Sequence, residues 1–219
     1  MKRVPEKEIV DEKEKAFRYA RAMKKYPLNE IFIDYIKNNR HLDNCRILDL
    51  GCGGAVISVA LAKSNPKIKE IIAVDASQEM INYAKKEINA LNLDKKIKAV
   101  KGKLPGFRKT LKTKKFDIIF SKYLLHHLPN PLLFWQEIKK LSAKGETAVF
   151  VWDLIRPGSE KDKEKIISRC FDLKIKNDFS NSLSAAFTVD EVKEQLKAVK
   201  LDLKIKKFSP VIFLAEKLS

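Results

Sequence analysis

The sequence predicts an α/β fold built on a seven-stranded, mostly parallel sheet with helices on both faces and an antiparallel last strand. Two observations favour this class. Short apolar runs rich in β-branched residues alternate with longer segments in which apolar residues recur at helical spacing. The first of these runs also leads into a glycine-rich turn, as in sheets whose strands are joined by helices. Alternating strands and helices form βαβ units with right-handed crossovers, which cover both faces of the sheet.

The elements are expected in a regular order along the chain. Residues 5–40 have the pattern of two amphipathic helices separated at Pro27, and these form an N-terminal helical cap. The expected strands are residues 45–50, 70–74, 97–100, 116–120, 147–154, 203–208 and 211–215. The expected helices are residues 55–63, 78–91 and 131–141, a helical insert from residue 159 and a further helix after Thr188.

Local signals justify the ends of several elements. Pro66 and Pro129 mark the end of one helix and the start of another. Thr188 and Glu191 have the spacing of a capping box, so a helix is expected to begin there. The link at residues 209–210 is too short for a crossover, which favours antiparallel pairing of the last two strands.

Length and cysteine content are typical of one intracellular domain. The 219 residues suffice for one core. The three cysteines have neither the spacing of zinc ligands nor that of a disulfide framework, so no metal site and a reduced, cytoplasmic location are expected. No apolar run is long enough to span a membrane. The expected parts are a cap (1–44), a core with the binding site (45–155), a helical insert (156–187) and a C-terminal helix with a strand pair (188–219).

The formal net charge is +17, from 45 basic and 28 acidic residues. Clustered lysines favour polyanions such as RNA, because phosphates release counterions when lysines bind them. Here the basic residues are mostly lysine and are spread over the expected helices and loops, without interleaved aromatic residues. Two interpretations stay open, namely a solvated lysine-rich surface and an RNA-binding surface.

The stretch ILDLGCGGAVIS, residues 47–58, has the features of a ligand-binding turn. Gly51 and Gly53 let a ligand approach the backbone, and the helix behind them directs free N–H groups to the same place. Asp75 ends the second strand 24 residues after Gly51, close to the position where an acid accepts both hydroxyls of an adenosine ribose. A dinucleotide fingerprint would continue with glycine where this chain has Val56. The turn therefore favours an adenosine ligand without a pyrophosphate.

Small residues at positions 51, 53 and 55 give this turn a resemblance to motif I of the class I S-adenosylmethionine-dependent methyltransferases. VDASQEMINYAKK resembles the second motif of the family, and KFDIIFSKYLLHHLPNP is similar to the fourth strand and following loop of the ubiquinone and menaquinone methyltransferases. The resemblance covers residues 45–218. It implies a Rossmann-like fold, methyl transfer, and S-adenosylmethionine as cofactor.

The resemblance also implies roles for individual residues. Asp49 is expected to bind the cofactor's ammonium group and Asp75 its ribose, and Ala76 and Met80 face the adenine. Two positions depart from the family pattern: Ala55 stands where a third glycine is usual, and Lys103 where many relatives carry an acid. The missing acid implies either main-chain recognition of adenine at Lys103 and Leu104 or weaker cofactor binding. The complete expected cofactor site is Asp49, Gly51, Cys52, Gly53, Asp75, Ala76, Met80, Gly102, Lys103, Leu104 and Ser121.

Proton transfer and acceptor binding are expected beyond the carboxyl ends of the fourth and fifth strands, where ligands of open α/β sheets bind. His126 and Asp153 are the expected catalytic residues, with a structural loop histidine and a turn cap as the alternatives. A structural role is expected for His127. The expected acceptor contacts are Tyr19, Tyr26, Arg156 and Asn181. The alternative roles for these residues are core packing, a local ion pair and helix capping.

The first function hypothesis is methyl transfer to a small-molecule or lipid-like acceptor by in-line displacement. A base is needed only where the acceptor arrives protonated. The Asn-Pro-Pro-Tyr motif of amino-group methylation on bases and the Pro-Cys pair of cytosine C5 enzymes are both absent from the sequence. Two alternatives stay open: an RNA methyltransferase with a lysine-rich surface, and a non-catalytic cofactor-binding regulatory or scaffold protein, motivated by Lys103.

Overall fold

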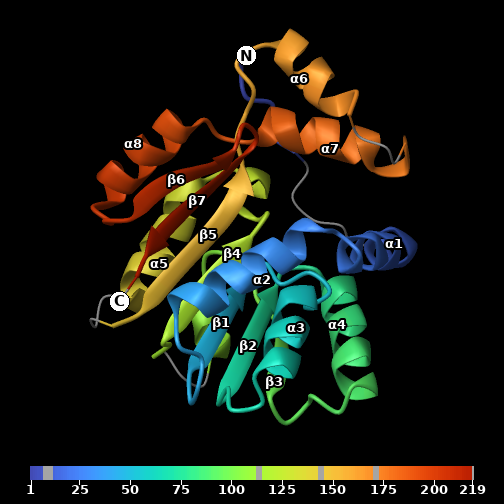
Figure 1. Ribbon diagram of the computed structural model, residues 1–219, viewed down its shortest axis with the longest axis vertical. Coiled ribbons are helices and arrows are strands. Elements are labelled where there is room, and N and C mark those ends of the chain that lie inside the picture. The colour runs from blue at the N-terminus through green and yellow to red at the C-terminus, as the bar shows by residue number, and fades with distance from the viewer. Residues whose placement is uncertain (7–11, 112–114, 143–145, 170–172, 219) are drawn as a thin grey trace.

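The computed structural model describes residues 1–6, 12–111, 115–142, 146–169 and 173–218, and it contains a seven-stranded sheet of order β3-β2-β1-β4-β5-β7-β6 (Figure 1). Strands β1 to β5 are parallel, whereas β7 runs antiparallel to both β5 and β6. This confirms the predicted fold class and the antiparallel last strand. The strands are β1 (Arg46–Leu50), β2 (Glu70–Asp75), β3 (Ile97–Lys101), β4 (Ile118–Lys122), β5 (Ala148–Leu154), β6 (Lys204–Ser209) and β7 (Ile212–Lys217).

The helices agree in order with those expected from the sequence. The capping box at the start of the last helix is present, because the Thr188 hydroxyl accepts from the Glu191 N–H and the Glu191 carboxylate accepts from the Thr188 N–H. The helices are α1 (Lys13–Lys24), α2 (Leu28–Asn39), α3 (Val56–Ser64), α4 (Gln78–Ala90), α5 (Pro131–Ser142), α6 (Glu160–Ile167), α7 (Leu173–Ala185) and α8 (Val189–Val199), with short 3-10 turns η1 (Phe107–Thr110) and η2 (Leu125–His127).

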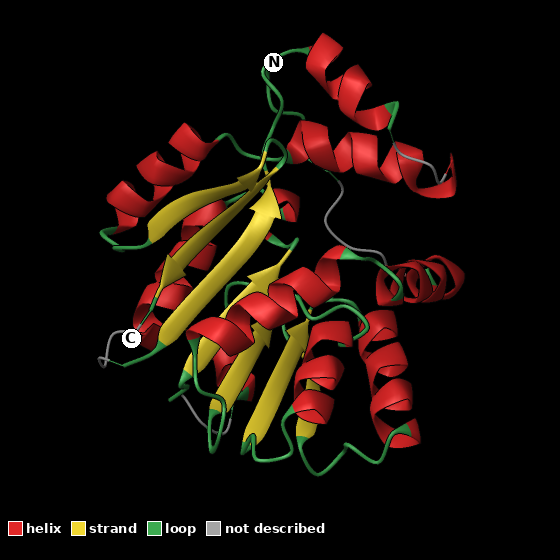
Figure 2. Ribbon diagram, in the orientation of Figure 1, coloured by secondary structure: helices red, strands yellow, loops and turns green. Residues whose placement is uncertain are grey.

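Two apolar cores lie on opposite faces of the sheet, and the alternation of strand side chains produces them (Figure 2). In β1, Ile47 belongs to the core under α2, α3 and α4, whereas Leu48 belongs to the core under α5 and α8. Each of these two side chains is fully buried. A sheet covered on both faces in this way leaves the carboxyl ends of its strands as the place for a ligand.

Helices α6 and α7 stand beyond the carboxyl ends of the strands, and the first residues of the chain lie against α7 (Figure 1). We call residues 1–6 the N-terminal strap. The Val4 N–H donates to the Ser184 carbonyl at 3.0 Å, and the Arg3 guanidinium donates to the carbonyl of Ala185 at 2.6 Å. Among residues of described placement, no helix has both the length and the apolar character needed to cross a bilayer.

The start of the first helix differs from the prediction. The helical pattern was expected from residue 5, but Pro5 and Glu6 belong to the extended strap and α1 begins at Lys13. The physical reason is that the strap backbone is hydrogen-bonded to α7, where the Val4 N–H donates to the Ser184 carbonyl. Residues 7–11 of that expected helix, and residues 170–172 of the expected insert, lie outside the described part of the chain.

Candidate functional site

A pocket lies beyond the carboxyl ends of β1, β2 and β4, between the glycine-rich turn, helix α1 and the loop after β4. All of the expected cofactor residues except Ser121 line it. The Ser121 side chain is buried instead, and its hydroxyl donates to the Leu50 carbonyl at 2.9 Å, which ties β4 to β1. Sequence segments far apart in the chain thus meet in one concave site, as the resemblance implied.

The glycines of the turn have different structural tasks. A β-carbon on Gly51 would lie 2.9 Å from the Leu124 side chain, so this glycine permits close packing of the β4 loop. A β-carbon on Gly53 would meet no atom within 4 Å, so the backbone there is open to the pocket. Both glycines have positive φ, and so does Ala55 at 58°. Ala55 was expected to begin the helix, but its left-handed conformation ends the turn, and α3 begins at Val56.

Two acidic residues, Asp49 and Asp75, line the pocket. Asp75 accepts the N–H of Gly53 at 2.8 Å and the N–H of Ser77 at 2.9 Å, so it joins the turn to the start of α4. Burial raises the pKa of Asp75. Asp49 is only 3% exposed and accepts the Ser58 hydroxyl at 2.7 Å. Burial, together with the negative charge of Asp75, raises the pKa of Asp49 to about 7. A cation that binds here would stabilise both carboxylates.

Lys122 is a pocket residue that sequence reasoning missed. Its ammonium donates to Asn29 Oδ1 at 2.9 Å and lies 4.0 Å from the ring centre of Tyr123. Burial lowers the pKa of Lys122 to about 7, so this amine exchanges protons near neutral pH. Alternation along a strand indicates that Ser121 and Lys122 project to opposite sides, but it does not tell which of the two side chains faces the pocket.

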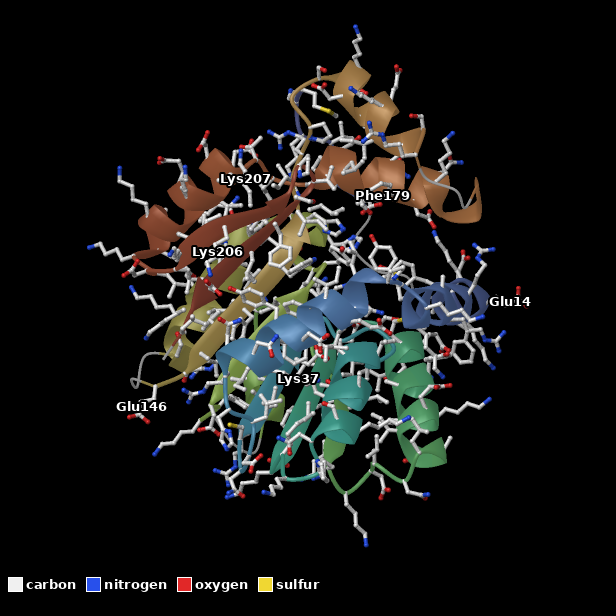
Figure 3. The ribbon with its side chains drawn as sticks, in the orientation of Figure 1. Glu14, Lys37, Glu146, Phe179, Lys206 and Lys207 are labelled. Carbon is white, nitrogen blue, oxygen red and sulfur yellow. The ribbon has the colours of Figure 1, made fainter. Side chains whose placement is uncertain are left out.

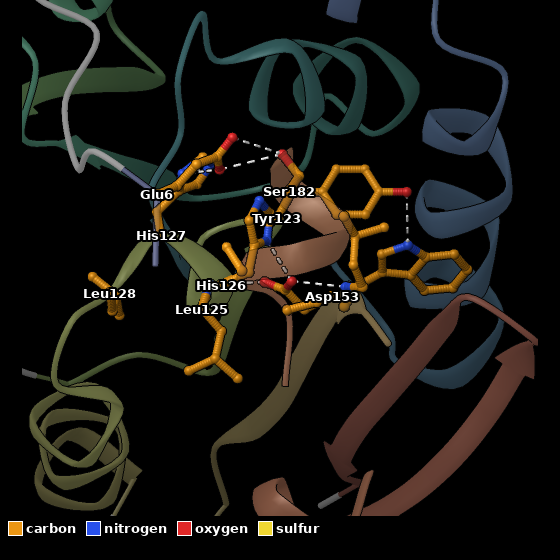
Figure 4. Close-up of polar contacts among 12 residues, drawn as sticks. Glu6, Tyr123, Leu125, His126, His127, Leu128, Asp153 and Ser182 are labelled. Carbon is orange, nitrogen blue, oxygen red and sulfur yellow. Dashed lines mark hydrogen bonds and ion pairs between the residues drawn. The ribbon is translucent and has the colours of Figure 1, made fainter. Parts of the chain in front are cut away.

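His126 of η2 and Asp153 near the end of β5 form a buried pair (Figure 4). His126 Nδ1 lies 2.6 Å from Asp153 Oδ1, and the two side chains are 3% and 2% exposed. The Asp153 carboxylate also accepts the N–H groups of Leu125 and Leu154, each at 2.7 Å. A carboxylate only accepts, so Nδ1 donates, and in the neutral form of the ring Nε2 keeps a free lone pair. The pair has the geometry of a base oriented by an acid.

The neighbouring histidine, and not His126, lines the pocket. His127 was expected to be structural, yet it lines the pocket. Its Nδ1 lies 3.1 Å from Glu6 Oε2 on the N-terminal strap. The ring centres of His126 and His127 are 4.1 Å apart. His126 therefore stands behind His127 as seen from the pocket. No sequence signal linked Glu6 to this loop, because 120 residues separate Glu6 from His126.

The structure separates the expected acceptor contacts. Tyr19 lines the pocket from α1, and burial raises the pKa of its phenol. Tyr26 packs edge-on against Tyr123, with ring centres 6.0 Å apart. Arg156 is buried, and its guanidinium lies 2.6 Å from Glu191, the local ion pair that the sequence left open as an alternative. Asn181 is exposed on α7, outside the pocket lining.

Comparison with known proteins gives consistent matches. A family model described as a methyltransferase domain matches residues 41–200. A ubiquinone biosynthesis O-methyltransferase of Actinobacillus pleuropneumoniae is 30% identical over 117 residues, which are 52% of this chain and 48% of the relative. The chain thus spans about half the length of the curated relatives it matches.

Two solved structures resemble most of the chain. A SAM-dependent methyltransferase from Aquifex aeolicus has a TM-score of 0.67 at 18% identity, and the match covers 94% of this chain and 97% of that one. The plantazolicin methyltransferase BpumL, solved with a triazolic desmethylPZN analog and SAH, has a TM-score of 0.68 at 18% identity, over 93% and 89% of the two chains. At these identities the likeness concerns the fold.

Proposed function

The chain belongs to the class I S-adenosylmethionine-dependent methyltransferases, and from this premise we propose that it transfers a methyl group to a small-molecule or lipid-like acceptor. The observation that carries the proposal is the pocket, in which the motif residues and the loop after β4 line one cavity. The curated relatives are O-methyltransferases of ubiquinone biosynthesis, which supports a hydroxyl as the accepting group.

The residues of this pocket fit S-adenosylmethionine. Asp49 is a buried carboxylate with a raised pKa, which a ligand ammonium would stabilise. The open backbone at Gly53 and the start of α3 suit the ligand carboxylate. Asp75 keeps acceptor capacity for two ribose hydroxyls beside its bonds to the backbone. When bound, this cofactor supplies a methyl group on a positively charged sulfonium, which is already an activated leaving group.

The task of the protein is then to position the acceptor and to exclude water. Tyr19 and Met23 of α1 cover the pocket, and Leu124 and Leu128 give the loop after β4 an apolar wall. Such positioning contributes up to about 7 to 11 kcal/mol to a two-substrate reaction. The Lys122 amine, with a pKa near 7, stands in the same wall and is suited to take or return a proton of the acceptor.

Transfer of a labelled methyl group tests the proposal directly. The protein is incubated with methyl-labelled S-adenosylmethionine and two fractions of a cell extract, one of small molecules and lipids and one of total RNA, and labelled products are identified by mass spectrometry. Label in the first fraction supports the proposal. Label confined to RNA supports an RNA methyltransferase, and intact cofactor binding without any transfer supports the regulatory alternative.

The RNA alternative depends on the net charge of +17. The labelled lysines of Figure 3 lie on separate elements, with Lys37 on α2 and Lys206 and Lys207 on β6. Lys206 is also paired with Glu216 at 2.5 Å. These lysines lie on two separate elements and Lys206 is paired, which favours the small-molecule acceptor over RNA.

The raised pKa of Asp49 predicts that cofactor binding depends on pH. Without ligand, the acid is protonated below pH 7, whereas a bound ammonium favours the carboxylate, so binding releases a proton. The affinity for S-adenosylhomocysteine should fall roughly fivefold from pH 7 to pH 6 and about tenfold more to pH 5. Calorimetry in buffers of different ionisation enthalpy measures both the affinity and the proton release.

Asp49→Asn is the control for this dependence. This variant should bind S-adenosylhomocysteine more weakly at pH 7. Its affinity should also depend less steeply on pH, because Asp49 no longer contributes to that dependence. Asp75 has a raised pKa too and acts in the same direction, so the difference between wild type and variant isolates Asp49. Equal slopes in both proteins would show that Asp49 does not titrate on binding.

A further inference from the structure

Beside the pocket, three side chains with metal-ligating atoms converge. Glu6, His126 and His127 each offer one nitrogen or oxygen, and these atoms lie within 4.8 Å of one another. Glu6 comes from the N-terminal strap and both histidines from η2. Hydrogen bonds hold the strap in place, because the Arg3 guanidinium donates to the carbonyls of His126 at 3.0 Å and of Leu128 at 3.2 Å.

Two of the three side chains, His126 and Glu6, have a supporting group of the kind that surrounds metal ligands. Asp153 holds His126 through Nδ1, and Figure 4 shows the other ring nitrogen of His126 pointing toward Glu6. The Ser182 hydroxyl lies 3.3 Å from both Glu6 oxygens and orients the carboxylate. Metal-binding histidines characteristically donate their second nitrogen to a carboxylate, which fixes the ring and raises its basicity.

The Nδ1 atom of His127 is a further indication of a ligand. It is buried and 3.1 Å from Glu6 Oε2, but the contact lacks the alignment of a hydrogen bond, so within the described residues this atom has no hydrogen-bond partner. Buried polar atoms are normally satisfied. Two ligands about 2.1 Å from one ion lie roughly 3.4 Å apart, so the Glu6–His127 separation already suits a shared ion.

We propose that Glu6, His126 and His127 bind one divalent transition-metal ion of the zinc type. Two imidazoles and one carboxylate are the donor set of catalytic zinc sites and of other first-row divalent ions, whereas calcium and magnesium select oxygen ligands. Three protein ligands leave at least one coordination position open. Sequence spacing gave no sign of the site, since the third ligand lies on the distant strap.

The site is placed to act on the acceptor, because His127 also lines the pocket. An ion at this position lowers the pKa of a hydroxyl that it binds and so creates an oxygen nucleophile at neutral pH. One candidate acceptor for the released proton is the Lys122 amine, which lines the same pocket as His127. This catalytic role rests on the proposed function, whereas the binding of the ion does not.

Cobalt(II) titration of the tag-free full-length protein tests the site without any turnover. Co²⁺ bound to nitrogen and oxygen ligands gives visible absorption bands, and Zn²⁺ should displace it at one ion per chain. Glu6→Gln and His127→Gln change half-buried residues and keep similar shapes; each should weaken Zn²⁺ binding by about tenfold or more. His41→Ala is the matched control, since the side chain of that histidine is 82% exposed and far from the cluster in sequence.

The outcomes separate clearly. Bands that appear in wild type and His41→Ala, and disappear in both cluster variants, support the site. Absent bands, equal bands in all four proteins, or bands lost only on replacing Cys52, the free cysteine in the pocket, would overturn it. Calorimetry with S-adenosylhomocysteine on the same samples reports cofactor binding separately, so failure of the metal site and failure of the proposed function are distinguishable.

Discussion

Asp75→Ala is expected to weaken S-adenosylhomocysteine binding by at least about a hundredfold, beyond ready detection by calorimetry. The carboxylate is assigned to both ribose hydroxyls, and each hydrogen bond to a charged group contributes about 1.5 to 3 kcal/mol. The same carboxylate accepts the Gly53 N–H, so its loss also removes a fixed point of the turn that faces the ligand. The two effects add in the same direction.

A matched variant separates this effect from a change of charge. Asp34 is an exposed acid on α2, with 63% of its side chain accessible, and Asp34→Ala should bind the ligand as wild type does. Circular dichroism and thermal unfolding establish that Asp75→Ala is folded. If Asp75→Ala binds S-adenosylhomocysteine within about threefold of the wild-type affinity, the assignment of the cofactor to this pocket is wrong, since no other residue is assigned to the ribose.

The residues that line the pocket around the glycine-rich turn were predictable to lie together, because their sequence signals are local. The turn at Gly51 and Gly53 follows a strand within a few residues, and Asp75 ends the next strand. Strand periodicity therefore fixes both positions before any tertiary contact is known. The structure places these residues in one pocket, since parallel strands bring their carboxyl ends to one edge of the sheet.

Residues whose position depends on register or on distant contacts were not predictable. Ser121 and Lys122 are neighbours on β4, and a one-residue difference in strand register decides which side chain enters the pocket. Arg156 pairs with Glu191 across the insert, and Glu6 reaches His127 across most of the fold. Periodicity carries no information about such pairs, because their partners are chosen by the packing of separate elements.

Asp153→Asn is expected to lower the rate of methyl transfer by about 10- to 100-fold while cofactor affinity stays nearly unchanged, because Asp153 orients His126 in the proposed metal site. The carboxylate accepts from three N–H groups, those of His126, Leu125 and Leu154. An amide of the same shape has one NH₂ group, which must face either Leu125 or His126. If the NH₂ group faces Leu125, it opposes the backbone N–H donor of that residue. If it faces His126, Nδ1 of the ring must accept a hydrogen bond, so the ring proton moves to Nε2. The ring then has no free lone pair directed toward Glu6.

Rate and binding must be measured on the same folded variant, because a mismatched buried amide also costs about 1 to 3 kcal/mol of folding stability. Asp190→Asn makes the same chemical change where the side chain is 88% exposed, and it should keep the wild-type rate. A purely structural Asp153 predicts a lower thermal midpoint with an unchanged rate at temperatures where the variant is folded. An oriented His126 predicts a lower rate there, with S-adenosylhomocysteine still bound, because Asp153 lies outside the cofactor pocket lining. The ratio of rate to affinity therefore distinguishes a positioning acid from a residue that only holds η2 to β5.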